Sequence, residues 1–167
     1  AITLPPVYPV YNDDGTFNED GPYANPVSIA EQSINRANTF RNVGNIYANI
    51  RLLQGLTFKS KFGLDYLDLN EHSYDPITTR QGERYNGIGL HAGSRVSNLM
   101  TNNLLNYITS IDKVHNIDAM IGHSFEKFIE RSSYIRGTDF PNENFEYLIS
   151  AANITDADNR YYEQRTN

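Results

Sequence analysis

The stretch RNVGNIYANIRLLQGLTFKSKFGLDY, residues 41–66, decides the fold of this chain. Apolar side chains fall on its even positions on both sides of Leu53-Gln54-Gly55, whereas the odd positions are mostly polar. Alternation with a period of two is the pattern of a half-buried β-strand. A glycine at the end of a short loop supplies the positive φ that a tight hairpin needs. We therefore predict two antiparallel strands joined by a short turn.

The turn also predicts how the two strands pair. If Leu52 lies opposite Leu56, Ile50 faces Phe58 and Ile46 faces Phe62, and a sheet favours such pairs of apolar side chains. A slip by one residue would move every side chain to the other face, so the alternation specifies the register strongly. We expect Ile46 and Phe62 to be direct cross-strand neighbours.

A second stretch repeats the pattern in residues 99–125, LMTNNLLNYITSIDKVHNIDAMIGHSF. Its apolar row uses odd positions both before and after a short turn at residues 112–115. This predicts a second antiparallel hairpin in which Tyr107 lies opposite Ile121.

Long polar connections separate the hairpins at residues 1–40, 68–98 and 128–167. Connections in a compact soluble domain usually have about 2–6 residues, whereas a membrane β-barrel has short turns on one side and long extracellular loops on the other. Each strand core has about 10–12 residues, close to the roughly 9–11 that cross a bilayer at a tilt. We predict an all-β fold, with antiparallel hairpins at 41–67 and 99–127 that form part of a large transmembrane β-barrel with long extracellular loops.

Two short helices are expected inside the extracellular loops. Ser28 and Glu31 have the spacing of a capping box, which predicts a helix over residues 28–35 with Ser28 as its N-cap. A second short helix is expected near residues 143–151.

The strands of such a barrel carry one row of side chains toward lipid and one toward the lumen. The apolar rows are predicted to face lipid: Ile46, Ile50, Phe58, Phe62, Leu64, Tyr66, Leu105, Tyr107, Ile117, Ile121 and Phe125. The polar rows are predicted to face the lumen: Asn45, Asn49, Arg51, Lys59, Lys61, Asp65, Asn106, Asp118 and Ser124.

A soluble antiparallel β-domain would give the same alternation. Its apolar faces would bury one another in a sandwich, and the protein would act as a ligand-binding or interaction module. The two alternatives differ in one feature, because only the soluble domain gathers Ile46, Phe58 and Ile121 in a shared dry interior.

Composition excludes several classes of protein. The net charge of −6 leaves no basic stripe to displace counterions from phosphates, so we expect no nucleic-acid partner. The absence of cysteine excludes a disulfide scaffold, thiolate metal sites and thiol catalysis. The chain has no run of about 18 apolar residues, so we predict no transmembrane helix.

The motifs of catalysis are incomplete. Residues 122–124 read Gly-His-Ser, the start of a nucleophile elbow, but Glu126 stands where the final glycine belongs and the segment is a predicted strand. The four histidines lack the spacing of zinc ligands, and Gly15 directly after Asp14 breaks the ligand order of a calcium loop. We expect neither an enzyme nor a metal or other cofactor.

Aromatic side chains in the predicted loops are the candidates for ligand contact, because rings of this kind stack on sugars. The alternative is that they pack the loops against one another. The candidates are Tyr8, Tyr11, Phe17, Tyr23, Tyr161 and Tyr162.

Several stretches resemble the barrel region of SusC/RagA-like TonB-dependent outer-membrane transporters. They are NVGNIYAN at residues 42–49, GLTFKSKFGLDY at 55–66, NLLNY at 103–107 and HNIDAMIGHSF at 115–125. The resemblance covers most of residues 5–127 and rests on the order and spacing of these stretches.

The resemblance implies a barrel of roughly 22 strands with a plugged lumen, placed in the bacterial outer membrane and surrounded by its lipid. It also implies energy supplied by TonB through a plug region that this chain does not contain, and a SusD-like surface lipoprotein as partner. Substrates of the family are oligosaccharides or peptides. We therefore expect this chain to be a fragment, the barrel segment of such an importer.

Overall fold

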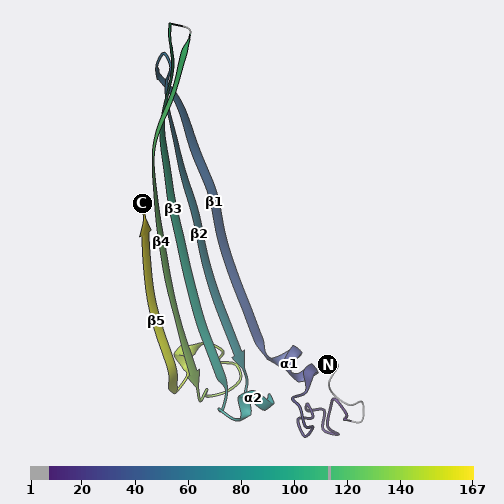
Figure 1. The fold of residues 1–167 in the computed structure, drawn as a ribbon. Helices are drawn as coiled ribbons and strands as arrows, with labels where there is room; N and C mark the ends of the chain where they lie inside the picture. Colours follow the sequence, from purple (N-terminus) through teal and green to yellow (C-terminus); the bar gives the residue numbers. More distant parts are fainter. Residues whose placement is uncertain (1–7, 113) are drawn as a thin grey trace. The chain divides into compact units, whose positions relative to one another are not determined.

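Five β-strands form a single sheet in the computed structural model, which describes residues 8–112 and 114–167. The strands lie side by side in sequence order, β1-β2-β3-β4-β5 (Figure 1). Their bounds are β1 Ile34–Leu53, β2 Leu56–Asp75, β3 Ile88–Ile111, β4 His115–Thr138 and β5 Asn153–Thr166. The helices are α1 Pro26–Gln32, α2 Arg80–Glu83 and the 3-10 turn η1 Leu148–Ser150. None of them is long and apolar enough to cross a membrane.

The strands extend well beyond the predicted hairpins. β1 begins at Ile34, inside the predicted first loop, and the predicted loop at 68–98 shrinks to residues 76–87 because β2 ends at Asp75 and β3 begins at Ile88. The reason is that the ladder is held by backbone hydrogen bonds, which continue where both rows of side chains are polar. Alternation marks the half-apolar part of a strand and not its end.

The predicted loop at 128–167 is also mostly strand. β4 continues to Thr138 and β5 follows, so that only residues 139–152 connect them. β5 was missed because its sequence, NITDADNRYYEQRT, is polar on both rows. The helix expected near residues 143–151 is reduced to η1.

The first helix begins earlier than predicted. Its N-cap is Asn25, whose side-chain oxygen accepts hydrogen bonds from the backbone N–H groups of Val27 and Ser28, so the capping box of Ser28 and Glu31 does not form. Pro26 at the first helical position has a fixed φ suited to this place. The Asn25 amide also donates to the carbonyl oxygens of Val10 and Asn18, which ties α1 to the preceding loop.

The turn between β1 and β2 contains the glycine with positive φ that the sequence predicts for it. Gly55 has a φ of 77°, and its carbonyl accepts a hydrogen bond from the N–H of Ile108 on β3 at 2.8 Å. A Cβ at this glycine would lie 2.1 Å from the Ile108 carbonyl oxygen. The position therefore requires glycine both for its backbone conformation and for the close approach of β3.

Cross-strand contacts agree in parity with the predicted register. Phe40 meets Tyr66 with ring centroids 6.4 Å apart, and Arg41 forms an ion pair with Asp65. Each contact joins even to even or odd to odd positions, as pairing of Ile46 with Phe62 requires. That direct pairing itself stays a prediction.

The chain forms two compact units, which we describe separately. The loop unit contains residues 8–38, 69–93 and 133–159, and the hairpin unit contains residues 39–68, 94–112, 114–132 and 160–167. The connections 76–87 and 139–152 belong to the loop unit, whereas both tight turns belong to the hairpin unit.

A small aromatic core organises the loop unit. Tyr74 and Phe140 are only 2% and 3% exposed, and their rings meet edge to face at 5.0 Å. A Cβ on Gly89 would lie 2.9 Å from the Phe140 ring, so the backbone of β3 approaches this ring closely. Burial raises the pKa of the Tyr74 hydroxyl. Phe140 thus holds the connection at 139–152 against β2 and β3.

The hairpin unit has no comparable interior among the residues that the structure describes. Ile46 and Ile121 are 75% and 70% exposed, and Phe62 is 46% exposed. Among the described residues, two large apolar side chains are buried, those of Tyr74 and Phe140. Both lie in the loop unit. The apolar rows are therefore open to whatever surrounds the sheet.

Candidate functional site

A hollow with a mixed polar and apolar lining lies on one face of β1, β2 and β3 in the hairpin unit. Its volume is about 250 Å³. Three of the side chains predicted to face the lumen line it, namely Asn45, Lys61 and Asp65. Asp65 also pairs with Arg41, with Nη2–Oδ2 and Nε–Oδ1 distances of 2.8 and 3.1 Å. Asn98 of β3 also lines the hollow, and Val43 and Met100 add apolar surface to it. That this face lines a lumen stays a prediction.

One polar pair interrupts the apolar rows. Ser60 on β2 donates its hydroxyl hydrogen to the side-chain oxygen of Asn103 on β3 at 2.7 Å. Ser60 alternates with Phe58 and Phe62, and alternate residues of a strand share a face. A polar side chain placed among apolar ones costs little when another polar group satisfies it.

Ion pairs follow directly after the apolar rows. On β2, Asp68 comes next in the row of Tyr66 and pairs with Arg95 at 2.9 Å. On β4, Lys127 comes next in the row of Phe125 and pairs with Glu163 at 3.4 Å. The apolar rows therefore end at charges on two different strands.

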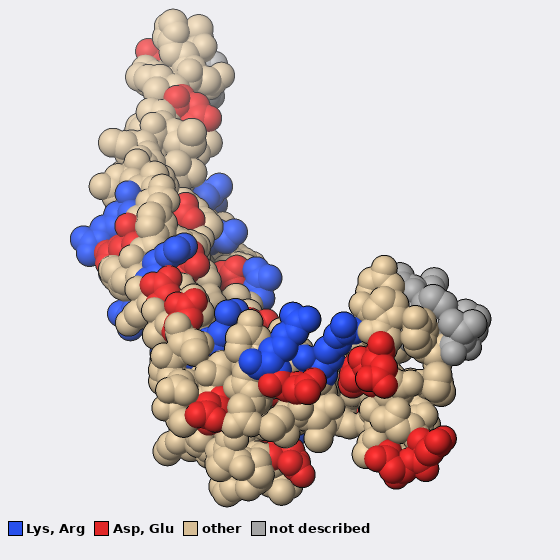
Figure 2. Space-filling model, turned by 90° about the horizontal axis from the view of Figure 1, so that it is seen from below, with Lys and Arg blue, Asp and Glu red and all other residues tan. Residues whose placement is uncertain are grey.

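Charges of both signs are interleaved on the surface. Figure 2 shows Lys and Arg side chains among Asp and Glu on the face in view, without a broad basic patch. The face in view therefore offers no extended anion-binding area.

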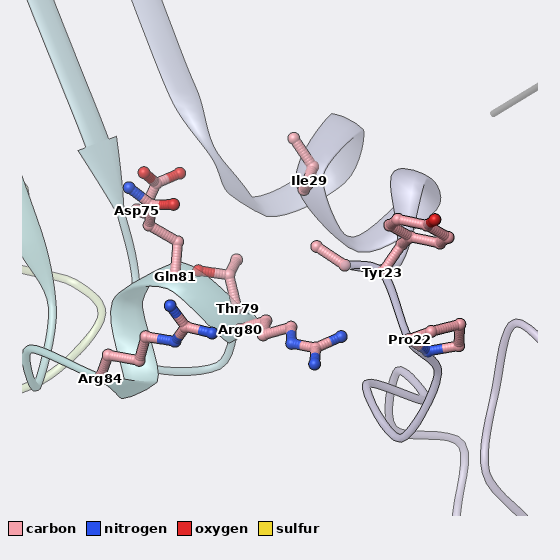
Figure 3. A pocket seen from close by; sticks show the side chains of 9 residues that line it. Pro22, Tyr23, Ile29, Asp75, Thr79, Arg80, Gln81 and Arg84 are labelled. Carbon is pink, nitrogen blue, oxygen red and sulfur yellow. The ribbon is translucent and has the colours of Figure 1, made fainter. Parts of the chain in front are cut away.

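A second cavity lies in the loop unit, between α1 with its preceding loop and α2 (Figure 3). Its volume is about 460 Å³. The lining combines apolar and charged groups: Pro22, Tyr23, Ala24, Ile29, Asp75, Thr79, Arg80, Gln81 and Arg84.

The end of α2 that borders this cavity is held firmly. Thr79 is 1% exposed and caps the helix, because its hydroxyl oxygen accepts from the Gly82 N–H at 3.1 Å. The same hydroxyl donates to the Pro76 carbonyl at 2.8 Å. A short helix with a buried cap places Arg80 and Arg84, four residues apart, on neighbouring positions of one face.

The predicted ligand-contacting aromatic residues do not gather in one place. Tyr23 lines the loop-unit cavity, whereas Tyr11 packs on Phe17 with ring centroids 5.2 Å apart, the alternative considered above. The expectation that Tyr161 and Tyr162 lie in a loop is wrong, because both lie in β5. Sequence periodicity had no means of detecting this strand.

Each of the two tyrosines of β5 contacts a side chain of β4. The Tyr162 ring meets Phe128 at 6.0 Å, and the guanidinium of Arg131 lies 5.5 Å from the Tyr161 ring centroid. These contacts join β5 to β4 across the sheet.

The cavity residues Arg80 and Arg84 were missed in the sequence. The signal was weak: Thr79 is a possible N-cap after Asp75-Pro76, and the two arginines are spaced i and i+4. Such a spacing is common on solvated helices, so it predicts a pocket only when the fold brings a second wall to it.

Within residues 8–112 and 114–167, no cluster of three or more His, Cys, Asp or Glu side chains is arranged to hold a metal ion. The acidic loop near residue 14 has another role. The hydroxyl and backbone N–H of Thr16 donate to Asp14 at 2.6 and 2.9 Å. The pKa of the Asp14 carboxyl group is lowered, chiefly by the hydrogen bond from the Thr16 hydroxyl. Asp14 thus closes a local turn.

The chain is similar in sequence to receptors of Formosa agariphila. It is 26% identical to TonB-dependent receptor P3 over 152 residues, which is 88% of this chain and 15% of the receptor. It is 30% identical to TonB-dependent receptor P26 over 139 residues, 76% of this chain and 14% of the receptor. The chain therefore spans only about a seventh of these relatives. No family model matches it.

Solved structures share the fold. The structure of the RagAB peptide transporter matches with a TM-score of 0.71 and 19% identity, covering 82% of this chain and 16% of that one. The "closed-closed" state of the RagAB peptide importer matches with a TM-score of 0.74 and 18% identity over 97% of this chain and 19% of that one. The predicted resemblance and fold class are confirmed: an antiparallel all-β sheet, open in this chain, that matches part of a transporter barrel.

Proposed function

We propose that this chain is a wall segment of a TonB-dependent outer-membrane importer. Its relatives are TonB-dependent receptors and transporters, not enzymes. Under this proposal the protein lies in the bacterial outer membrane, and the long connections of the loop unit face the medium.

The observation that carries the proposal is the exposed apolar face of the hairpin unit. Ile46 is 75% exposed and Ile121 is 70% exposed, and the described residues provide no second layer to cover them. Acyl chains would cover these rows at a gain of about 25 cal/mol for each Å² removed from water. The ion pairs of Asp68 and Lys127 then lie where the apolar band gives way to polar headgroups.

The opposite face suits a water-filled lumen. Asn45, Lys61 and Asp65 line the hollow there together with the apolar Val43 and Met100, and charges can remain hydrated on that side. The soluble alternative would instead have a polar exterior and an apolar interior. In that case a second sheet or a layer of helices must bury Ile46 and Ile121.

The substrate and partner belong to the same proposal. The RagAB neighbours are described as a peptide transporter and importer, which supports a peptide as substrate, with an oligosaccharide as the other class. A SusD-like lipoprotein would cover the extracellular end, and TonB would act through a plug outside this chain.

Extraction of the full-length protein tests the proposal. We expect it to remain in the membrane fraction, to require detergent, and to migrate faster before heating than after it. An unheated sample that is soluble in buffer and shows one mobility would contradict the proposal and favour the soluble binding module.

A further inference from the structure

We propose that the loop-unit cavity binds a carboxylate group carried on a ligand with a ring or aliphatic body. As a binding site the cavity depends on the loop unit alone, whereas its use during import rests on the function proposed above. The cavity lies between α1 and α2 and is lined by side chains from both (Figure 3).

Size and lining fit a small organic ligand. A volume of about 460 Å³ falls in the range of roughly 300–1,000 Å³ found for ligand pockets. Pro22, Tyr23 and Ile29 supply an apolar wall. Tyr23 and Ile29 are 58% and 43% exposed, so they have surface left to cover the body of a ligand.

Two guanidinium groups supply the recognition. Arg80 donates from Nη1 to the Gly21 carbonyl at 2.6 Å, which fixes its side chain and leaves its other N–H groups available. It extends from α2 toward Pro22 and Tyr23 (Figure 3). For Arg84, no hydrogen bond or ion pair of its guanidinium is found among the described residues. Guanidinium groups bind carboxylates in a bidentate manner.

Among the described residues, no ion pair joins Asp75, the acidic group in the lining, to Arg80 or Arg84. Asp75 accepts the hydroxyl hydrogen of Ser33 at 2.5 Å. The chain as a whole has a net charge of −6, yet Arg80 and Arg84 outnumber this one carboxylate in the cavity. This local reversal of charge favours an anionic ligand.

Calorimetric titration of the full-length protein in detergent tests the proposal. The probes are a tripeptide with a free carboxyl terminus, the same tripeptide amidated, a trimer of galacturonic acid and a trimer of galactose. We expect an acidic probe to bind at least tenfold more tightly than its neutral counterpart. The acidic probe that binds more tightly identifies the source of the carboxylate, a peptide terminus or a uronic acid.

Arg84→Gln and Arg36→Gln form a matched pair of variants. Both remove one positive charge from the loop unit, but Arg36 lies outside the cavity in a 3.4 Å ion pair with Glu146. We expect Arg84→Gln to weaken the acidic probe about tenfold or more, the effect of losing a charged hydrogen bond, and Arg36→Gln to leave it nearly unchanged. Equal effects of the two variants, or equal affinity for acidic and neutral probes, would overturn the proposal.

The two proposals fail in different ways. A soluble protein that still binds the acidic probe through Arg84 would overturn the import function and leave the carboxylate site standing. A protein that needs detergent and shifts its mobility on heating, but has no preference for acidic probes, would overturn the carboxylate site and leave the import function standing.

Discussion

Single side chains carry the distinction between the two faces of the sheet. Phe62 belongs to the predicted lipid-facing row, with 46% of its surface exposed, whereas its neighbours in sequence lie in the other row. We expect Phe62→Lys to lower the free energy of unfolding in lipid vesicles by roughly 2–4 kcal/mol if the site lies near the bilayer midplane. Urea-induced unfolding of the full-length protein in vesicles measures this change.

Asn45→Lys is the matched control, because it introduces the same charge into the opposite row and, in the predicted register, Asn45 lies opposite Gly63, next to Phe62 in sequence. We expect a change within about 0.5 kcal/mol, as for an ordinary surface substitution. If the two lysines were equally costly, the assignment of the faces would be wrong.

Gly55 tests the turn at the same scale. Gly55→Ala places a Cβ 2.1 Å from the Ile108 carbonyl oxygen at a φ of 77°, whereas Gly15→Ala meets a φ of 84° with nothing within 4 Å. Both changes strain the backbone, by about 1–3 kcal/mol, but only the first also displaces β3. We expect a larger loss of stability for Gly55→Ala in the same unfolding assay. Equal losses of stability would show that the close approach of β3 adds nothing to the effect of Gly55→Ala.

Strands and connections define the next scale, where Phe140 is the test. It packs on Tyr74 and is 3% exposed, whereas Phe145 in the same connection is 47% exposed. We expect Phe140→Ala to cost about 3 kcal/mol locally, in the range for a buried aromatic residue, and to raise hydrogen exchange in residues 76–87 and 139–152. Phe145→Ala should leave exchange there unchanged. Faster exchange spread equally over the hairpin unit would contradict a core confined to the loop unit.

The sequence predicts the central part of each hairpin and little of its extension. Residues 41–66 alternate because one face is apolar, and the parity of the Phe40–Tyr66 contact agrees with this. Residues 68–75 and β5 lack an apolar row, although the backbone ladder runs through them. Where both faces of a strand are polar, apolar and polar residues do not alternate, so the sequence periodicity does not indicate a strand.

The cavity was beyond reach for a different reason. Tyr23 and Arg84 are far apart in the chain and line one cavity only because the loop unit brings α1 beside α2. Single-sequence periodicity describes neighbours along an element, and contacts of this kind depend on the packing of connections.

At the scale of the whole molecule, the sheet has two edges, β1 and β5, that are not paired within the described chain. Unpaired backbone groups are not tolerated in lipid. The import proposal therefore requires strands outside this chain to pair with both edges, which agrees with the chain spanning 15% of a related receptor.

Labelling of single cysteines in β2 tests the central claim most directly, since this chain contains no cysteine of its own. Positions 58, 62 and 64 sample one row, and positions 59, 61 and 65 sample the other. In the full-length protein in vesicles, with no other cysteine, we predict that the first row resists a water-soluble maleimide and that fluorophores attached there are quenched by brominated lipid. The second row should react readily and escape quenching. Equal reactivity of both rows, or a first row that is protected without any quenching by lipid, would contradict the account.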